Sequence, residues 1–265
     1  TEHGRLHPDF ASPNRRFVNP WLARLTSRVT AISNATRAAL VEHEYLRGDR
    51  IQTVYNGIEP VQVDSEEVSR LRSSLGLKAE SVLLGTVARF DPVKNHEMML
   101  RAFRKVLDTQ PGCRLAIVGD GEQRPVIEAE IAALDLQGKV FLPGYLSDPT
   151  VWIAAMDLFL LSSHTEGTSM TLLEAMSLDK PSVVTAVGGN PEIVLHRETG
   201  RVSQANDADG FAGEILDLLS DREVFTETGN AAGKRFQECF HCSVMQQAYD
   251  TIYREMVSVA VTTRD

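Results

Sequence analysis

The chain has 265 residues, which is long for one domain and short for two, because domains cluster at roughly 100 to 150 residues. Apolar residues make up 43% and charged residues 24%, so disordered and fibrous classes are excluded. The net charge is −9, and only residues 1–59 are basic, with eight arginines against six acids. A nucleic-acid partner is therefore disfavoured, because binding to phosphate backbones requires a basic surface.

The sequence carries no signal for export or membrane insertion. No apolar run reaches the roughly 18 residues that cross a bilayer, and TEHGRLHPDF lacks the basic and apolar regions of a signal peptide. The three cysteines, Cys113, Cys239 and Cys242, are an odd number in a long chain, which fits reduced thiols better than a disulfide framework. We therefore expect a cytoplasmic protein.

Residues before 60 predict two short strands with their helices. WLARLTSRVTAIS indicates a helix that runs into a strand, NATRAALVEHEYL a helix capped by Ser33 or Asn34, and IQTVYNG a second strand and a turn. Two strands do not form an independent sheet of useful stability. We therefore expect residues 1–59 to be the remnant of an N-terminal acceptor-side domain whose earlier part is absent.

Past residue 60, short apolar runs alternate with amphipathic stretches, which predicts a parallel sheet flanked by helices. Four of the runs are almost continuously apolar, as in strands covered on both faces. The fold class is α/β, with a doubly wound domain over residues 60–242 and a helix over 243–265 that packs back toward the N-terminal domain. The expected strands are 81–90, 114–119, 139–144, 157–163 and 181–187, and the expected helices are 96–109, 122–135, 148–156, 171–178, 209–219, 221–238 and 243–258.

Ligands of such sheets bind beyond the carboxyl ends of the strands. The loop after 157–163, HTEGTSMTLLEAM, places Glu166 in a turn and Glu174 in the first turns of a helix. Carboxylates so placed can accept hydrogen bonds from sugar hydroxyls. The amides around Thr168 to Thr171, at the start of the helix, can hold a phosphate oxygen. Alone, Glu174 is better explained as a solvated residue that the helix dipole favours, and only the other loops together favour a role in binding.

Two cations follow the first strand of this sheet, in ARFDPVKNH. Arg89 and Lys94 can neutralise a diphosphate leaving group as a glycosidic bond breaks. No metal is then required. Together the loops predict a pocket for a sugar, a diphosphate and a ribose.

Five segments in order carry a resemblance to a known family. ARFDPVKNHEMML, LAIVGDGE, EGTSMTLLEAM and VGGNPEIV, after a VYNGIE turn, resemble the retaining glycosyltransferase family 4 of the GT-B fold. The resemblance extends over nearly the whole chain. It implies a nucleotide-sugar donor domain of the doubly wound kind, preceded by an incomplete N-terminal acceptor domain.

The resemblance also implies a role for each matching position. Glu166 would bind hydroxyls of the transferred sugar, Glu174 the ribose, and Arg89 and Lys94 the diphosphate. The remaining implied site residues are His3 in TEHGR as the acceptor-side active-site histidine, the amides of Thr168, Ser169 and Met170 beside the diphosphate, Gly119 on the donor side, and main chain from Leu142 to Tyr145 against the base. Thr168 and Ser169 stand where many relatives have Phe-Gly, so a Cβ lies where backbone approaches phosphate.

The expected function is retaining transfer of a hexosyl group from a UDP- or GDP-linked sugar to a saccharide, polysaccharide or lipid-linked acceptor, without metal or cofactor. Such enzymes can contact the inner membrane face through the region that is absent. An alternative is a nucleotide-sugar-binding module without turnover, because catalysis at a two-domain cleft needs both walls. A nicotinamide-dependent dehydrogenase lacks its G-x-G-x-x-G here, and a GT-B-like epimerase shares the sheet but not the run of loops.

Two further motifs are interpreted as structural. Cys239 and Cys242 form a CFHC pattern, but further ligands at metal spacing are lacking, which disfavours a metal or redox role. Asp207 and Asp209 form a D-x-D that opens a helix, where acids cap and stabilise.

Overall fold

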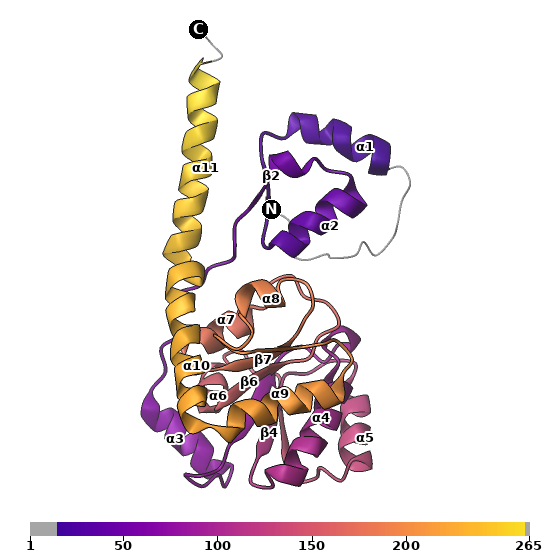
Figure 1. Ribbon diagram of the computed structural model, residues 1–265, viewed down its shortest axis with the longest axis vertical. Coiled ribbons are helices and arrows are strands. Elements are labelled where there is room, and N and C mark those ends of the chain that lie inside the picture. Colours follow the sequence, from indigo (N-terminus) through magenta and orange to yellow (C-terminus); the bar gives the residue numbers. More distant parts are fainter. Residues whose placement is uncertain (1–14, 263–265) are drawn as a thin grey trace.

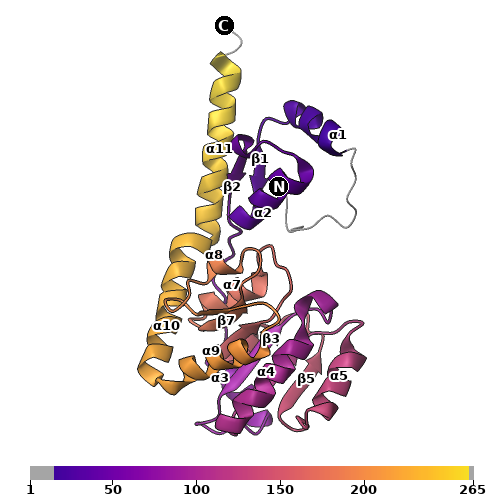
Figure 2. The ribbon, with the colours of Figure 1, turned by 45° about the vertical axis from the view of Figure 1, so that its right-hand side comes forward.

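The computed structural model describes residues 15–262. They form a small N-terminal unit, a larger sheet domain, and the helix α11 (Cys242–Thr262), which leaves the sheet domain and runs beside the N-terminal unit (Figures 1 and 2). One contact between these parts is an ion pair at 3.4 Å from Arg28 to Glu255 of α11. Among the described residues no helix combines the length and apolarity needed to span a bilayer.

The N-terminal unit contains one pair of parallel strands, whose core includes Ala31, Leu40 and Ile51. The cap predicted for its second helix is confirmed at Ser33, whose hydroxyl accepts a hydrogen bond from the Thr36 amide at 3.0 Å. Its helices and strands are α1 (Arg15–Leu22), β1 (Val29–Ala31), α2 (Asn34–Glu44) and β2 (Ile51–Thr53).

The sheet domain is built on six parallel strands in the order β5-β4-β3-β6-β7-β8. The five predicted strands are confirmed with shorter bounds, and β8 was missed. Its three residues include the buried Arg201, paired with Asp217 at 2.9 Å, so it shows no apolar run. The strands are β3 (Leu83–Val87), β4 (Arg114–Val118), β5 (Val140–Gly144), β6 (Leu158–Leu161), β7 (Ser182–Thr185) and β8 (Arg201–Ser203).

Helices cover both faces of the sheet, as the apolar runs predicted. In β4, Leu115 and Ile117 belong to the core on one face, and Ala116 and Val118 to the core on the other. The first face is covered by α4 (His96–Thr109), α5 (Arg124–Ala133) and α9 (Ala208–Ser220), and the second by α3 (Ser65–Ser74), α6 (Thr150–Ala155), α7 (Met170–Ser177) and α10 (Arg222–Arg235). The fold is thus the expected doubly wound α/β sheet.

Two connections between the parts run side by side. Ile58 and His241 form a parallel bridge, as two strands of a sheet do. The Ile58 amide donates to the Phe240 carbonyl at 3.0 Å, and the Ile58 carbonyl accepts from the Cys242 amide at 2.9 Å.

The short helix α8 (Asn190–Ile193) of the sheet domain contacts the N-terminal unit. The Glu192 carboxylate accepts the amides of Asn34 and Ala35, each at 2.8 Å, at the start of α2.

Candidate active site

The order of the strands reverses between β3 and β6, because β4 and β5 lie on one side of β3 and β6 to β8 on the other. Loops that leave two such neighbouring strands diverge and open a crevice at the carboxyl edge of the sheet. The loop after β3 carries Lys94, and the loop after β6 carries Glu166. The sequence predicted that both residues follow a strand, and the strand order places those two strands at the switch point.

The loop after β3 is held rigidly against the loop after β6. Asp91 caps the single turn Pro92–Lys94 by accepting the Val93 amide at 3.0 Å. The buried hydroxyl of Ser162 donates to the carbonyl oxygens of Lys94 at 2.8 Å and Asn95 at 3.1 Å. These contacts position the main chain from which the Lys94 side chain extends.

Lys94 and Glu166 form an ion pair between Nζ and Oε1. The side chains are 22% and 10% exposed, so the pair is shielded from water on most sides and its charges interact more strongly than at an open surface. The hydroxyl of Ser163, which is fully buried, donates to the same Glu166 oxygen at 3.0 Å. The arrangement holds the Lys94 ammonium group and the Glu166 carboxylate against each other.

The main chain of Glu166 rests on the loop after β7. The Gly189 amide donates to the Glu166 carbonyl at 3.2 Å. A Cβ at Gly189 would lie 2.1 Å from the Gly167 carbonyl oxygen, closer than any side chain can approach. The glycine therefore sets how near the two loops can come.

The start of α7 presents amides rather than hydroxyls. Ser169 is the N-cap, and its hydroxyl accepts the Leu172 amide at 3.4 Å, so its side chain is turned into the helix. Thr168 reaches across to the N-terminal unit and donates to the Ile32 carbonyl at 3.4 Å. Met170 is exposed. Because the first turn of a helix has amides without intrahelical partners, this helix end has the chemistry that an anion requires.

Glu174 lies farther along α7 and is half-buried. Its Oε2 atom is buried, and no residue in the described part of the chain gives it a hydrogen bond. Burial raises the pKa of Glu174 above its ordinary value of 4.5, and the Asp148 carboxylate adds to this increase. An acceptor that is buried without a donor suits a ligand that supplies one, such as a sugar hydroxyl.

The other predicted site residues differ in burial and in contacts. Arg89 is 75% exposed and pairs with Asp91 at 2.7 Å, so its guanidinium is held at the surface by that carboxylate. Gly119 has φ +142, and a Cβ there would lie 1.9 Å from the Ala88 carbonyl oxygen, so loop packing alone requires a glycine. Leu142 lies in β5 and is half-buried, and Tyr145 just beyond β5 is 76% exposed. His3 lies outside the described residues.

Ser163 and Gly189 are parts of the site that sequence reasoning did not select. Signals for both exist: two serines follow an apolar strand in LFLLSS, and two glycines follow another in VGGNPE. Polar or small residues at the carboxyl end of a buried strand indicate a role at the crevice.

These loops, with their glycines and the E-x7-E spacing of Glu166 and Glu174, correspond to a described family. The family of glycosyl transferases group 1 matches residues 67–235, more than half of the chain. The chain belongs to this family. The match runs from α3 to the end of α10, so it includes both carboxylates and Lys94.

Curated relatives agree with this assignment. N-acetyl-alpha-D-glucosaminyl L-malate synthase of Bacillus anthracis is 30% identical over 230 residues, which are 86% of this chain and 60% of the relative. UDP-Gal:alpha-D-GlcNAc-diphosphoundecaprenol alpha-1,3-galactosyltransferase of Escherichia coli is 25% identical over 244 residues, 88% of this chain and 63% of the relative. The chain thus spans less than two thirds of the length of both curated relatives.

Solved structures share the fold. Anabaena Alr3699/HepE in complex with UDP and glucose superposes with a TM-score of 0.84 at 26% identity, over 95% of this chain and 70% of that one. Sucrose-phosphate synthase from Thermosynechococcus elongatus gives a TM-score of 0.79 at 22% identity, over 97% of this chain and 67% of that one. The chain has the GT-B type of fold.

Proposed function

We propose that this chain binds a nucleotide diphosphate sugar and takes part in retaining transfer of its hexosyl group to a saccharide or lipid-linked acceptor. The observation that supports this most is the partly buried Lys94–Glu166 pair at the switch point. The loop that carries Glu166 leads into α7, which carries the Glu174 oxygen without a described donor. UDP and glucose are named with HepE, which resembles this chain. UDP- or GDP-linked sugars are the donor class to test first.

In this proposal Lys94 exchanges partners when the donor binds. Its ammonium moves from Glu166 to the diphosphate, while the amides at the start of α7 hold further phosphate oxygens. Glu166, still held by Ser163, then accepts hydroxyls of the transferred sugar. The open acceptor of Glu174 takes hydroxyls of the ribose.

The transfer step follows from this placement of charge. The bond from the anomeric carbon to the diphosphate oxygen breaks, and its electron pair stays on the diphosphate, which Lys94 stabilises. The acceptor hydroxyl attacks from the same face, and its proton passes to the departing phosphate oxygen, which retains the anomeric configuration. We expect transfer not to require Mg²⁺ or Mn²⁺, which rate measurements with and without these ions test.

Substitutions in the ion pair test donor binding. Lys94→Ala should weaken both UDP and UDP-sugar by tenfold or more, because a charge-assisted hydrogen bond contributes about 1.5 to 3 kcal/mol. Glu166→Gln should weaken the UDP-sugar and leave UDP nearly unchanged, because this carboxylate is assigned to the sugar. Isothermal titration calorimetry with UDP, UDP-glucose and GDP-mannose measures both effects.

The control is Lys105→Ala, which removes an exposed cation of α4 that pairs with Asp209. Its affinity for the donor should equal that of the wild type. Wild-type affinity in both Lys94→Ala and Glu166→Gln would refute the proposed site.

A second candidate function is nucleotide-sugar binding without turnover. It is favoured by the location of Lys94, Glu166 and Glu174, which all lie in the sheet domain, since transfer requires an acceptor wall as well as a donor wall. A transfer assay on the same chain that binds UDP-sugar in calorimetry separates the two. Binding with no product supports the module, and product formation supports the enzyme.

A further inference from the structure

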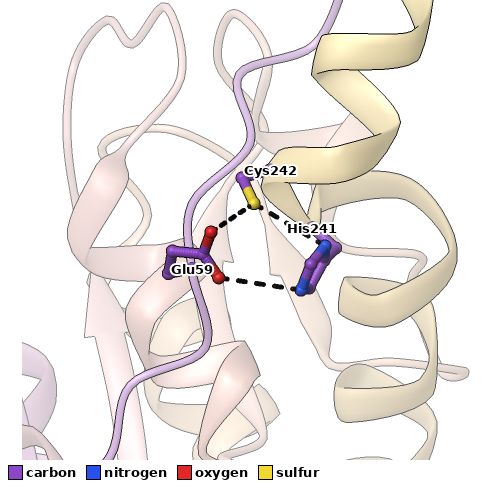
Figure 3. A group of neighbouring side chains, drawn as sticks. All are labelled: Glu59, His241 and Cys242. Atoms are coloured by element: carbon purple, nitrogen blue, oxygen red, sulfur yellow. Dashed lines mark hydrogen bonds and ion pairs between the residues drawn. The ribbon is translucent and has the colours of Figure 1, made fainter.

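Outside the crevice, three side chains with metal-binding atoms converge where the two connections between the parts of the chain meet. Glu59 follows the N-terminal connection, and His241 and Cys242 lie at the start of α11 (Figure 3). One ligand atom from each lies within 4.8 Å of the others. None of these residues belongs to the proposed donor site.

The distances within the group resemble the edges of a small coordination polyhedron. Cys242 Sγ lies 2.8 Å from Glu59 Oε1 and 3.8 Å from His241 Nδ1. His241 Nε2 lies 4.0 Å from Glu59 Oε2. Ligands about 2.0 to 2.3 Å from one tetrahedral ion stand about 3 to 4 Å apart. To complete that geometry, the exposed Glu59 side chain must shift and the His241 ring must turn its Nε2 atom toward Cys242, because the 3.8 Å distance is measured to Nδ1.

The main chain already holds these three residues together. Hydrogen bonds join Ile58 to Phe240 at 3.0 Å and Cys242 to Ile58 at 2.9 Å, so the residues next to Glu59 and those around His241 are aligned as in a sheet. A Cβ at Gly57 would lie 2.8 Å from the His241 carbonyl oxygen, so the two segments approach as closely as a glycine allows. Preorganised ligands lose less conformational entropy when an ion binds.

A neighbouring hydroxyl is placed to orient the imidazole. Ser243 Oγ lies 2.8 Å from His241 Nδ1. The Ser243 amide also donates to Nδ1 at 3.2 Å, so binding of an ion through Nε2 requires the ring to leave this amide and to donate its Nδ1 proton to the Ser243 hydroxyl. Histidine ligands of metals usually donate their second ring nitrogen in this way.

We infer that Glu59, His241 and Cys242 form a binding site for a divalent zinc ion. A thiolate, an imidazole and a carboxylate are the ligand types that zinc accepts, and hard ions such as Mg²⁺ and Ca²⁺ do not prefer the thiolate. Three protein ligands leave the fourth tetrahedral position to water. The site joins residues 183 positions apart in the chain, and it fastens the N-terminal connection to α11.

The test is zinc binding by the untagged full chain after treatment with a chelator. Calorimetry with Zn²⁺ alone should give one ion per chain, and Co²⁺ in its place should give the charge-transfer absorption of a cobalt thiolate. Cys242→Ser should abolish that absorption and weaken Zn²⁺ at least tenfold. Cys239→Ser is the matched control, because Cys239 is three residues away and packs against the core of the sheet domain; it should bind Zn²⁺ like the wild type.

Two further variants keep the test valid if Cys242→Ser folds poorly. Glu59 is exposed, with 78% of its side chain open to water, so Glu59→Gln should fold normally and bind Zn²⁺ at least tenfold more weakly. Ser243→Ala should weaken Zn²⁺ by about tenfold, as removal of an outer partner does at other sites. The inference is overturned if the wild type binds no zinc, or if Glu59→Gln and Cys242→Ser bind it as tightly as Cys239→Ser does.

Discussion

Glu174 carries a buried carboxylate oxygen without a donor in the described chain, and burial of this kind costs about 1 to 3 kcal/mol. The folded chain also holds the Glu174 proton more tightly than the unfolded chain does, because the pKa is raised. The free energy of unfolding therefore falls as the pH rises above 4.5, the ordinary value. A residue so costly to the free protein indicates a function in binding.

Glu174→Gln should consequently stabilise the unliganded chain by about 1 kcal/mol at neutral pH, with the gain disappearing toward pH 4. The same variant should bind UDP more weakly, because an amide replaces a charged acceptor for the ribose. Urea unfolding at several pH values and calorimetry with UDP measure the two effects. A variant with lower stability at neutral pH would contradict the assignment.

His96 makes the fold sensitive to acid. It is 3% exposed, stacks edge-on against Phe90, and neither ring nitrogen has a partner among the residues that the structure describes. Burial lowers the pKa of His96 to about 4, and the nearby Lys94 adds to this decrease. The unfolded chain therefore binds the proton first, and stability is lost as the pH falls from about 6.5 toward 4.

His96→Leu should remove this part of the acid sensitivity. Between pH 7 and pH 4 the wild type should lose roughly 3 kcal/mol more than the variant, since one pKa unit corresponds to about 1.4 kcal/mol. Urea unfolding of both proteins across this range provides the measurement. Parallel stability curves would show that His96 does not titrate as inferred.

At the scale of elements, the loop after β7 determines where the loop after β6 lies. Gly189→Ala introduces a Cβ 2.1 Å from a backbone oxygen, and neither backbone can move without the other. We expect a loss of about 1 to 3 kcal/mol in stability and weaker binding of the UDP-sugar. The control is Gly213→Ala in α9, where a Cβ meets nothing within 4 Å; helix propensity predicts a gain of up to about 1 kcal/mol there.

Elements with a strong local signal were predicted from the sequence, and the others were not. The strand β6 is a continuous apolar run and β3 is nearly one, as is typical of strands that are covered on both faces of a parallel sheet. By contrast, β8 is stabilised by pairing with β7 and by the buried Arg201 ion pair. Both are tertiary contacts that leave no periodic pattern.

In the candidate site too, residues with a signal in one segment were predicted, and contacts between segments were not. Glu166 and Glu174 were found because their spacing and their place after a strand are visible in one segment. The pairing of Lys94 with Glu166 and the hydrogen bond from Ser163 depend on how two loops meet. The approach of Glu59 to His241 and Cys242 is harder still to predict, since Glu59 and Cys242 are 183 positions apart in the chain.

At the scale of the whole molecule, Glu192 joins the sheet domain to the N-terminal unit. Its carboxylate accepts the first amides of α2 and the hydroxyl of Tyr55 at 2.8 Å, as a side chain does at an N-cap. Burial, followed by the hydrogen bond to Glu192, raises the pKa of Tyr55 to about 12. Tyr55 therefore remains a hydrogen-bond donor throughout the physiological range.

Glu192→Ala should loosen this contact without unfolding the sheet. Loss of a cap costs about 1 kcal/mol, so the first amides of α2 should exchange with deuterium about fivefold faster. Mass spectrometry of peptides that cover 34–44 and 114–118 measures exchange in the helix and in β4 as a reference. Glu198→Ala, at an exposed position in the same segment, should leave both peptides unchanged; accelerated exchange in β4 would mean a general loss of stability.

The two connections that pair through Ile58 and His241 also limit how the parts of the molecule can move. A single flexible connection permits rotation in any direction, but two adjacent strands joined by hydrogen bonds permit bending mainly about one axis that passes through them. Any swing of the N-terminal unit relative to the sheet domain must therefore deform this paired segment and also break the hydrogen bonds that Glu192 and Thr168 make with the N-terminal unit.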